Sequence, residues 1–203
     1  IQMTPWQRAW VEWASLERAV LDFHEQPEEI QEYLDIQNRL HKRVADFVAD
    51  CPCTFINVFD NMTDTVSPSY YRDYCLPIYE NYAKQLEGTG KILGIHMDGL
   101  LANLKQEIAD TPCNVIESLT VPPAGNISLA EAKAAWPDKV VSMNCAPHLH
   151  WSEPEEVRKG YEALVEEWGG KTGLILNRSE SVPVKTIEAH ISAAMDAFGY
   201  DKV

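Results

Sequence analysis

The stretch Ile92-Leu-Gly-Ile-His-Met-Asp-Gly99 is the most informative part of this chain of 203 residues. Its apolar residues are typical of a buried β-strand, and the strand ends in an imidazole and a carboxylate. Residues two apart in an extended strand point to the same side, so we expect His96 and Asp98 to project together. Gly99 then lets the backbone turn. α/β proteins place their chemistry at such strand ends, although a His beside an Asp can equally be structural.

Four further stretches have the alternation or the apolar, β-branched composition of strands, and most of them also end in polar side chains. They are Thr54–Phe59 followed by Asp60 and Asn61, Asn114–Ile116 followed by Glu117, Lys139–Met143 followed by Asn144, and Gly173–Leu176 followed by a loop with Arg178 and Glu180. Helical spacing of apolar residues separates the strands. The chain therefore predicts five strand-then-helix units, the pattern of a parallel sheet.

Start and stop signals place the helices along the chain. Two amphipathic helices are expected before the first strand, over Pro5–Glu25 and from Pro27 to about Ala49. A later helix begins at Ser67-Pro68, and Pro77 should interrupt it. Another helix follows Gly99. Two more begin at Ser-x-x-Glu capping boxes that start at Ser128 and Ser152, and the last begins near Ile187.

Five such units fit either an open doubly wound sheet or the later part of an eight-fold barrel. In a barrel the carboxyl ends of all strands converge on one mouth, whereas an open sheet brings together only those at its switch point. Because polar residues end nearly every strand, we predict an α/β fold of the (β/α)8 TIM-barrel type. The chain would hold its carboxyl-terminal five strand-helix units, preceded by two helices, as a single domain over residues 1–203.

Composition excludes several classes of function. The formal net charge of −14 disfavours a general nucleic-acid binder and an anionic membrane surface, because both need clustered Lys and Arg. The sequence has neither an apolar run of membrane-spanning length nor a signal segment. Five cysteines without framework spacing fit a reducing compartment, so we expect a cytoplasmic protein. No glycine-rich nucleotide-binding pattern follows any strand.

Several motifs occur in a recognisable order: Asp60-Asn61, Ser67-Pro68 opening a helix with Pro77, His96-Met-Asp98-Gly99, Asn144 after a strand, and a loop ending in Pro183 and Thr186. This order resembles the uroporphyrinogen decarboxylase superfamily, which also contains methyltransferases that pass methyl groups between corrinoid cofactors and thiols such as coenzyme M. The resemblance covers essentially the whole chain but about the later two thirds of a typical member. It implies that the opening strands of the barrel are absent from this sequence.

The resemblance also implies a metal site. The methyltransferase branch binds zinc through a His-x-Cys pair at a strand end and a distant Cys in the last loop. His96 matches the first ligand, Asp98 stands at the first Cys, and counting back from Thr186 places Glu180 at the second. A His with two carboxylates suits zinc, and also manganese, iron or magnesium. We therefore predict a metal-dependent methyltransferase that activates a thiol or other acceptor and acts on a small molecule, with a corrinoid or a corrinoid protein as methyl carrier.

Asp60, Asn61 and Asn144 are predicted to position the substrate, although Asp-Asn is also ordinary turn chemistry. Glu117 is predicted to act as a base or a further ligand. Decarboxylation of a porphyrinogen-like acid is the alternative, but that branch needs an arginine cluster, of which this sequence offers only Arg178 at its strand ends. A third hypothesis is a barrel that binds a ligand without catalysis.

Overall fold

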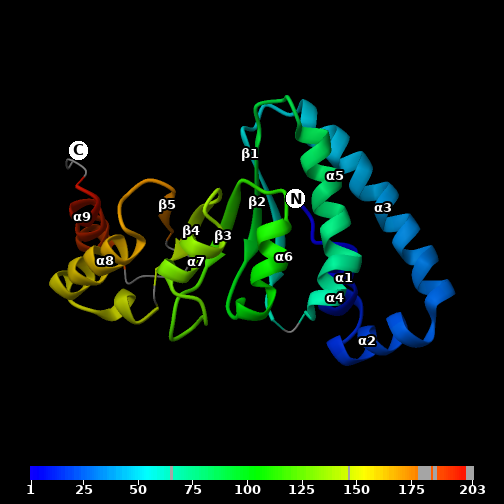
Figure 1. Ribbon diagram of the computed structural model, residues 1–203, viewed down its shortest axis with the longest axis horizontal. Helices are drawn as coiled ribbons and strands as arrows, with labels where there is room; N and C mark the ends of the chain where they lie inside the picture. The colour runs from blue at the N-terminus through cyan, green and yellow to red at the C-terminus, as the bar shows by residue number, and fades with distance from the viewer. Residues whose placement is uncertain (65, 146, 178–183, 185–186, 200–203) are drawn as a thin grey trace.

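Figure 1 shows the computed structural model of the chain, in which a parallel sheet of five strands occupies the centre. The structure describes residues 1–64, 66–145, 147–177, 184 and 187–199. The strands are β1 (Phe55–Met62), β2 (Ile92–Met97), β3 (Val115–Leu119), β4 (Val140–Asn144) and β5 (Leu174–Asn177). The five strands predicted from the sequence are thus confirmed.

The strands lie in the sheet in the order of the sequence, β1-β2-β3-β4-β5, and all four pairs are parallel. A doubly wound sheet needs a reversal of strand order, and these five strands have none. Because crossover connections are right-handed, a sequential order puts the connecting helices on one face of the sheet. The sheet is therefore a section of a (β/α)8-type barrel, with helices outside and a bare inner face, as the sequence predicted.

The described helices alternate with the strands after an amino-terminal helical segment. Before β1 lie α1 (Pro5–Arg8), α2 (Leu16–Glu25) and α3 (Pro27–Asp50). Between the strands lie α4 (Pro68–Tyr70), α5 (Leu76–Leu86), α6 (Lys105–Asp110), α7 (Leu129–Ala135) and α8 (Pro154–Trp168), and α9 (Ile187–Phe198) follows β5. In Figure 1, α6 and α7 lie in front of the central strands, and α3 packs along α5.

Two helix predictions were wrong in detail, one in its continuity and one in its capping. The expected helix over Pro5–Glu25 is divided, because a π-helical turn over Ala9–Trp13 ends at the extended Ala14 and Ser15 then caps α2. The predicted capping box at Ser152 does not form, since α8 is preceded by Glu153, which makes no side-chain capping bond. The capping box at Ser128 is present with both of its hydrogen bonds.

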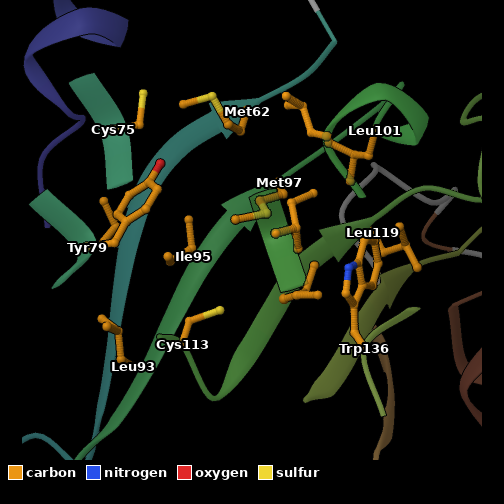
Figure 2. Close-up of a cluster of buried hydrophobic side chains, with 14 of the residues drawn as sticks. Met62, Cys75, Tyr79, Leu93, Ile95, Met97, Leu101, Cys113, Leu119 and Trp136 are labelled. Carbon is orange, nitrogen blue, oxygen red and sulfur yellow. The ribbon is translucent and has the colours of Figure 1, made fainter. Parts of the chain in front are cut away.

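The main apolar core lies between the sheet and its helices. Figure 2 shows Ile95 and Met97 of β2 among side chains from neighbouring strands and helices. Both are fully buried, as are Leu119 of β3 and, almost completely, Trp136 at the end of α7. Because alternate residues of a strand face opposite sides, these buried residues lie on the helix side and their neighbours in the strands lie on the bare face. No described helix is long and apolar enough to cross a membrane.

Asp60 of β1 joins the amino-terminal segment to the core. Its carboxylate is fully buried and accepts hydrogen bonds from the Thr4 backbone N–H (2.7 Å) and hydroxyl (3.0 Å), and from the hydroxyl of Tyr79 in α5. Burial raises the pKa of Asp60 from 3.8 to about 6, because these hydrogen bonds and the charge of His96 offset only part of the desolvation cost. Asp60 thus fastens α1 and α5 to β1.

This buried carboxyl group gives the stability of the protein a specific pH dependence. Between pH 4 and 6 the folded state holds a proton at Asp60 that the unfolded state has lost, so this contribution to the free energy of unfolding falls as the pH rises. In Asp60→Asn the contribution is absent. We expect the difference in unfolding free energy, wild type minus variant, to drop by about 2 kcal/mol from pH 4 to pH 7 in urea denaturation.

Asp138→Asn is the matched control, because it removes the charge of an exposed carboxylate on the same domain. Its difference from the wild type should show no such drop. A difference for Asp60→Asn that stays constant over this pH range would contradict the buried ionisation.

Candidate functional site

The bare face of the sheet forms a concave hollow of about 920 Å³. Its walls come from all five strands, and Phe55, Phe59, Ile92 and Ile175 are between 41% and 57% exposed there. The residues that line the hollow are Phe55, Asn57, Phe59, Ile92, His96, Asn114, Val115, Glu117, Ser118, Val140, Ser142, Ile175 and Asn177. A large, mainly apolar hollow with a few polar groups is the usual form of a small-molecule site.

The carboxylate of Glu117 lies at the centre of the polar groups in this hollow. One of its oxygens, Oε2, accepts from His96 Nδ1 at 2.6 Å and from Asn57 Nδ2 at 3.1 Å. The other, Oε1, lies 3.2 Å from both Asn177 Nδ2 and Ser118 Oγ. Four donors therefore hold the carboxylate, and they come from β1, β2, β3 and β5.

Strand register brings these residues together. His96 of β2 is paired with Glu117 of β3, so the two side chains lie next to each other on the same face. β4 joins through Asn144, whose Oδ1 lies 3.2 Å from Ser118 Oγ and whose Nδ2 donates to the Ser118 carbonyl at 3.3 Å. Ser118 has a left-handed backbone with φ of 75°, where the register of β3 with β4 shifts.

The surroundings of Glu117 favour its ionised form. Burial by itself would raise its pKa, but the hydrogen bond and charge of His96 outweigh burial, with help from the hydrogen bonds of Asn57 and Ser118. The net effect lowers the pKa of Glu117 below its ordinary value. Glu117 is therefore a carboxylate at neutral pH, and it orients the imidazole of His96.

His96 presents its second nitrogen to the hollow side of this network. Because Nδ1 faces Glu117, Nε2 on the opposite side of the ring points away from the carboxylate, and it has no hydrogen-bond partner in the described part of the chain. The ring of Phe59 lies 5.9 Å from that of His96, centroid to centroid. A neutral imidazole with Nδ1–H on a carboxylate can accept a proton at Nε2.

The remaining predicted site residues are not gathered around His96. The Asp98 carboxylate accepts from the Gly99 N–H at 2.5 Å and from the hydroxyl of Thr120, so it links the ends of β2 and β3. Asp60 faces the helices, contrary to the expectation that it joins the other strand ends, because its place in the alternation of β1 puts it on the core side. Asn61 is exposed at the end of β1, with φ of 41°.

Three members of the network were not predicted as site residues, namely Asn57, Ser118 and Asn177. Asn57 lies between Phe55 and Phe59 on one face of β1. A polar residue in the middle of an otherwise apolar strand face is a sequence signal that could have identified Asn57 as a site residue. Asn177 directly follows the apolar run of β5. For Ser118 the sequence offered no signal, because its role depends on the shifted register of β3.

The predicted metal ligands fit a metal in part. His96 has the arrangement typical of a ligating histidine, with Nδ1 on a carboxylate and Nε2 directed away. However, no three His, Cys, Asp or Glu side chains within the described ranges are placed to hold one metal ion. Glu180, the third predicted ligand, lies outside the described residues, as does Arg178. The described residues alone do not make a metal site.

Comparison with known proteins gives one family and one fold. The family model described as uroporphyrinogen decarboxylase matches residues 12–199. Among solved structures, a methyltransferase from Methanosarcina mazei superposes with a TM-score of 0.71 at 13% sequence identity, covering 96% of this chain. The chain spans 57% of the length of that methyltransferase. Curated protein sequences give no significant match.

The hydrogen bonds of Glu117 predict how the stability of the protein changes when the charge of Glu117 is removed. In Glu117→Gln an NH₂ group replaces one acceptor oxygen, so two of the four donors lose their partner, and we expect the free energy of unfolding to fall by about 1–3 kcal/mol at pH 7. Because the pKa of Glu117 is lowered, this contribution is present above pH 4.5 and is lost as the pH falls through the lowered pKa.

Urea denaturation at pH 7 and pH 3 measures both effects. Glu166→Gln, which changes an exposed carboxylate of α8, is the control and should leave stability within about 0.5 kcal/mol of the wild type. Equal stability of Glu117→Gln and the wild type at pH 7 would show that the network does not hold the strands.

Proposed function

The chain belongs to the uroporphyrinogen decarboxylase family, and from that premise we propose that it catalyses methyl transfer to a thiol at the concave face of the sheet. The observation that carries the proposal is the Glu117–His96 pair inside a hollow bordered by apolar side chains. The name of the Methanosarcina mazei methyltransferase points the same way, although 13% identity supports the shared fold alone.

His96 has the geometry of a general base for this reaction. A thiol attacks a methyl group only after it has lost its proton, because the thiolate is the nucleophile. Nε2 of His96 can take that proton, and the Glu117 carboxylate beside Nδ1 stabilises the imidazolium that results. The new sulfur–carbon bond forms as the bond between the methyl group and its carrier breaks, with the electron pair leaving on the carrier.

The amides around the pair act as positioning groups. Asn57 and Asn177 each donate to one oxygen of Glu117, so the carboxylate cannot rotate away from His96 without losing a hydrogen bond. Asn144 holds Ser118, which in turn lies against Glu117. In this proposal a corrinoid, carried by a partner protein, is one candidate for the methyl carrier that approaches the open hollow.

Decarboxylation of a porphyrinogen-like acid has less support in the described residues. Such substrates carry several carboxylates and require cationic partners. The described lining of the hollow contains neither Lys nor Arg, and it contains the carboxylate of Glu117. The hollow is thus better suited to a neutral or cationic molecule.

The proposed base can be tested by substitution in the full-length protein. His96→Gln should lower kcat for thiol methylation about 100-fold or more at pH 7, because the thiol then ionises without a base. Raising the pH above about 8.5, where a free thiol ionises, should restore much of the lost rate. This recovery separates a missing base from a misfolded site.

His24→Gln is the matched control, since it changes an exposed histidine of α2 and should keep the wild-type rate. A variant His96→Gln with unchanged kcat at pH 7 would refute the role of His96. Absence of thiol methylation by the wild type with every methyl donor supplied, a methylated corrinoid among them, would refute the proposed function and favour a binding protein.

Metal binding at His96, Asp98 and Glu180 stays a separate prediction and an alternative to the proton transfer above, because Nδ1 of His96 faces Glu117 and the one lone pair on Nε2 cannot both bind a metal and accept a proton. Zinc is the first expectation, with manganese or iron as alternatives. Elemental analysis of the purified full-length protein should find about one divalent metal per chain, and His96→Ala should lose it. A metal content that is the same in His96→Ala as in the wild type would contradict this ligand set.

A further inference from the structure

The described lining of the hollow contains a negatively charged side chain and no Lys or Arg. The charged side chain is the carboxylate of Glu117, and the lining also has a single imidazole. The chain as a whole carries a formal net charge of −14, so its field attracts cations and repels anions.

The rings of Phe59 and Phe55 line the same hollow as this carboxylate. Phe59 is 57% exposed and lies next to His96, which bonds Glu117. Phe55 is 46% exposed and its ring lies across Gly94, where a Cβ atom would come within 2.6 Å of the ring. Gly94 therefore lets the Phe55 ring lie close to the sheet and show a face to the hollow.

Exposed aromatic rings that share a hollow with a carboxylate are features that recognise an alkylated cation. The ring quadrupole attracts a positive charge that is too well covered by methyl groups to form strong hydrogen bonds. A carboxylate supplies the countercharge. The hollow also has apolar side chains, Ile92 and Val140 among them, against which methyl groups can pack.

We propose that the methyl donor at this site is an onium group, in which the methyl carbon is bonded to a positively charged nitrogen or sulfur. The inference rests on the proposed methyl transfer. The proposed function does not identify the methyl donor, and this inference does. Thiolate and onium combine to give a thioether and a neutral amine or sulfide: the sulfur–carbon bond forms, and the electron pair of the broken bond stays on nitrogen or sulfur. No oxidant or reductant is required.

The apolar hollow also suits the energetics of this step. The reactants are an anion and a cation, and the products are both neutral. Charge is lost along the reaction, so the step is favoured to the extent that bound reactants and apolar walls displace water from the hollow. The proton released by the thiol stays on His96 and leaves as the products leave.

A binding experiment tests the recognition of the cation without turnover. Choline and its neutral carbon analogue 3,3-dimethylbutan-1-ol have nearly the same shape and differ in charge. In calorimetric titration of the full-length protein we expect choline to bind at least about tenfold more tightly. Phe59→Leu, which keeps an apolar side chain and removes the ring, should reduce that preference about threefold or more while the neutral analogue binds as before.

Phe47→Leu is the control, because Phe47 is 74% exposed on α3 and does not line the hollow, and it should keep the wild-type preference. Equal affinity for choline and the neutral analogue, or equal weakening of both by Phe59→Leu, would overturn the inference. Thermal unfolding of each variant shows whether a loss of binding comes from a loss of fold.

A second measurement separates this inference from the proposed function. The full-length protein is given a thiol acceptor with tetramethylammonium, trimethylsulfonium or a methylated corrinoid, and the thioether is quantified. Thioether from an onium supports the inference, and the donor consumed identifies nitrogen or sulfur. Thioether from the corrinoid alone overturns the inference and leaves methyl transfer standing, whereas selective choline binding with no thioether from any donor supports the cation site and refutes methyl transfer.

Discussion

The hydrogen bonds of the Glu117 carboxylate connect the inner face of the whole sheet. A half-buried carboxylate is costly unless donors surround it, and here four donors from β1, β2, β3 and β5 do so. Asn144 of β4 joins through Ser118. The same bonds that satisfy the charge therefore fix the relative positions of strands whose residues lie up to 60 positions apart in sequence. One carboxylate both ties the face together and orients its only described imidazole.

A second constraint is that the sheet is covered on one face. Sequential strand order with right-handed crossovers places the connecting helices on the outside, and the apolar core forms there. The inner face is left to residues that the core does not use, so polar groups such as Asn57 and His96 can stand beside exposed Phe59. The two carboxylates within the described strands are divided by this rule: Asp60 of β1 takes the core side and fastens helices, whereas Glu117 of β3 takes the hollow.

Much of the architecture was predictable from local patterns. The five strands, the capping box at Ser128 and the start of α3 at Pro27 follow from alternation, capping chemistry and proline geometry within a few residues. The errors occurred where competing local interactions interrupt or replace the expected helix start. At Pro5–Glu25 the helical spacing is continuous, yet the chain breaks at Ala14 and Ser15 and restarts as α2. At Ser152 the hydroxyl bonds the His148 carbonyl instead of capping α8.

The sequence by itself determined the alternation of strands and helices, the family and the candidacy of His96 and Glu117, because these depend on the order of residue types along the chain. Only the tertiary structure decided which polar side chains meet. Pairing His96 with Glu117 depends on the register of β2 and β3, and adding Asn57 and Asn177 depends on the order of strands in the sheet. Register and order are set by packing between distant segments, so no local pattern specifies them.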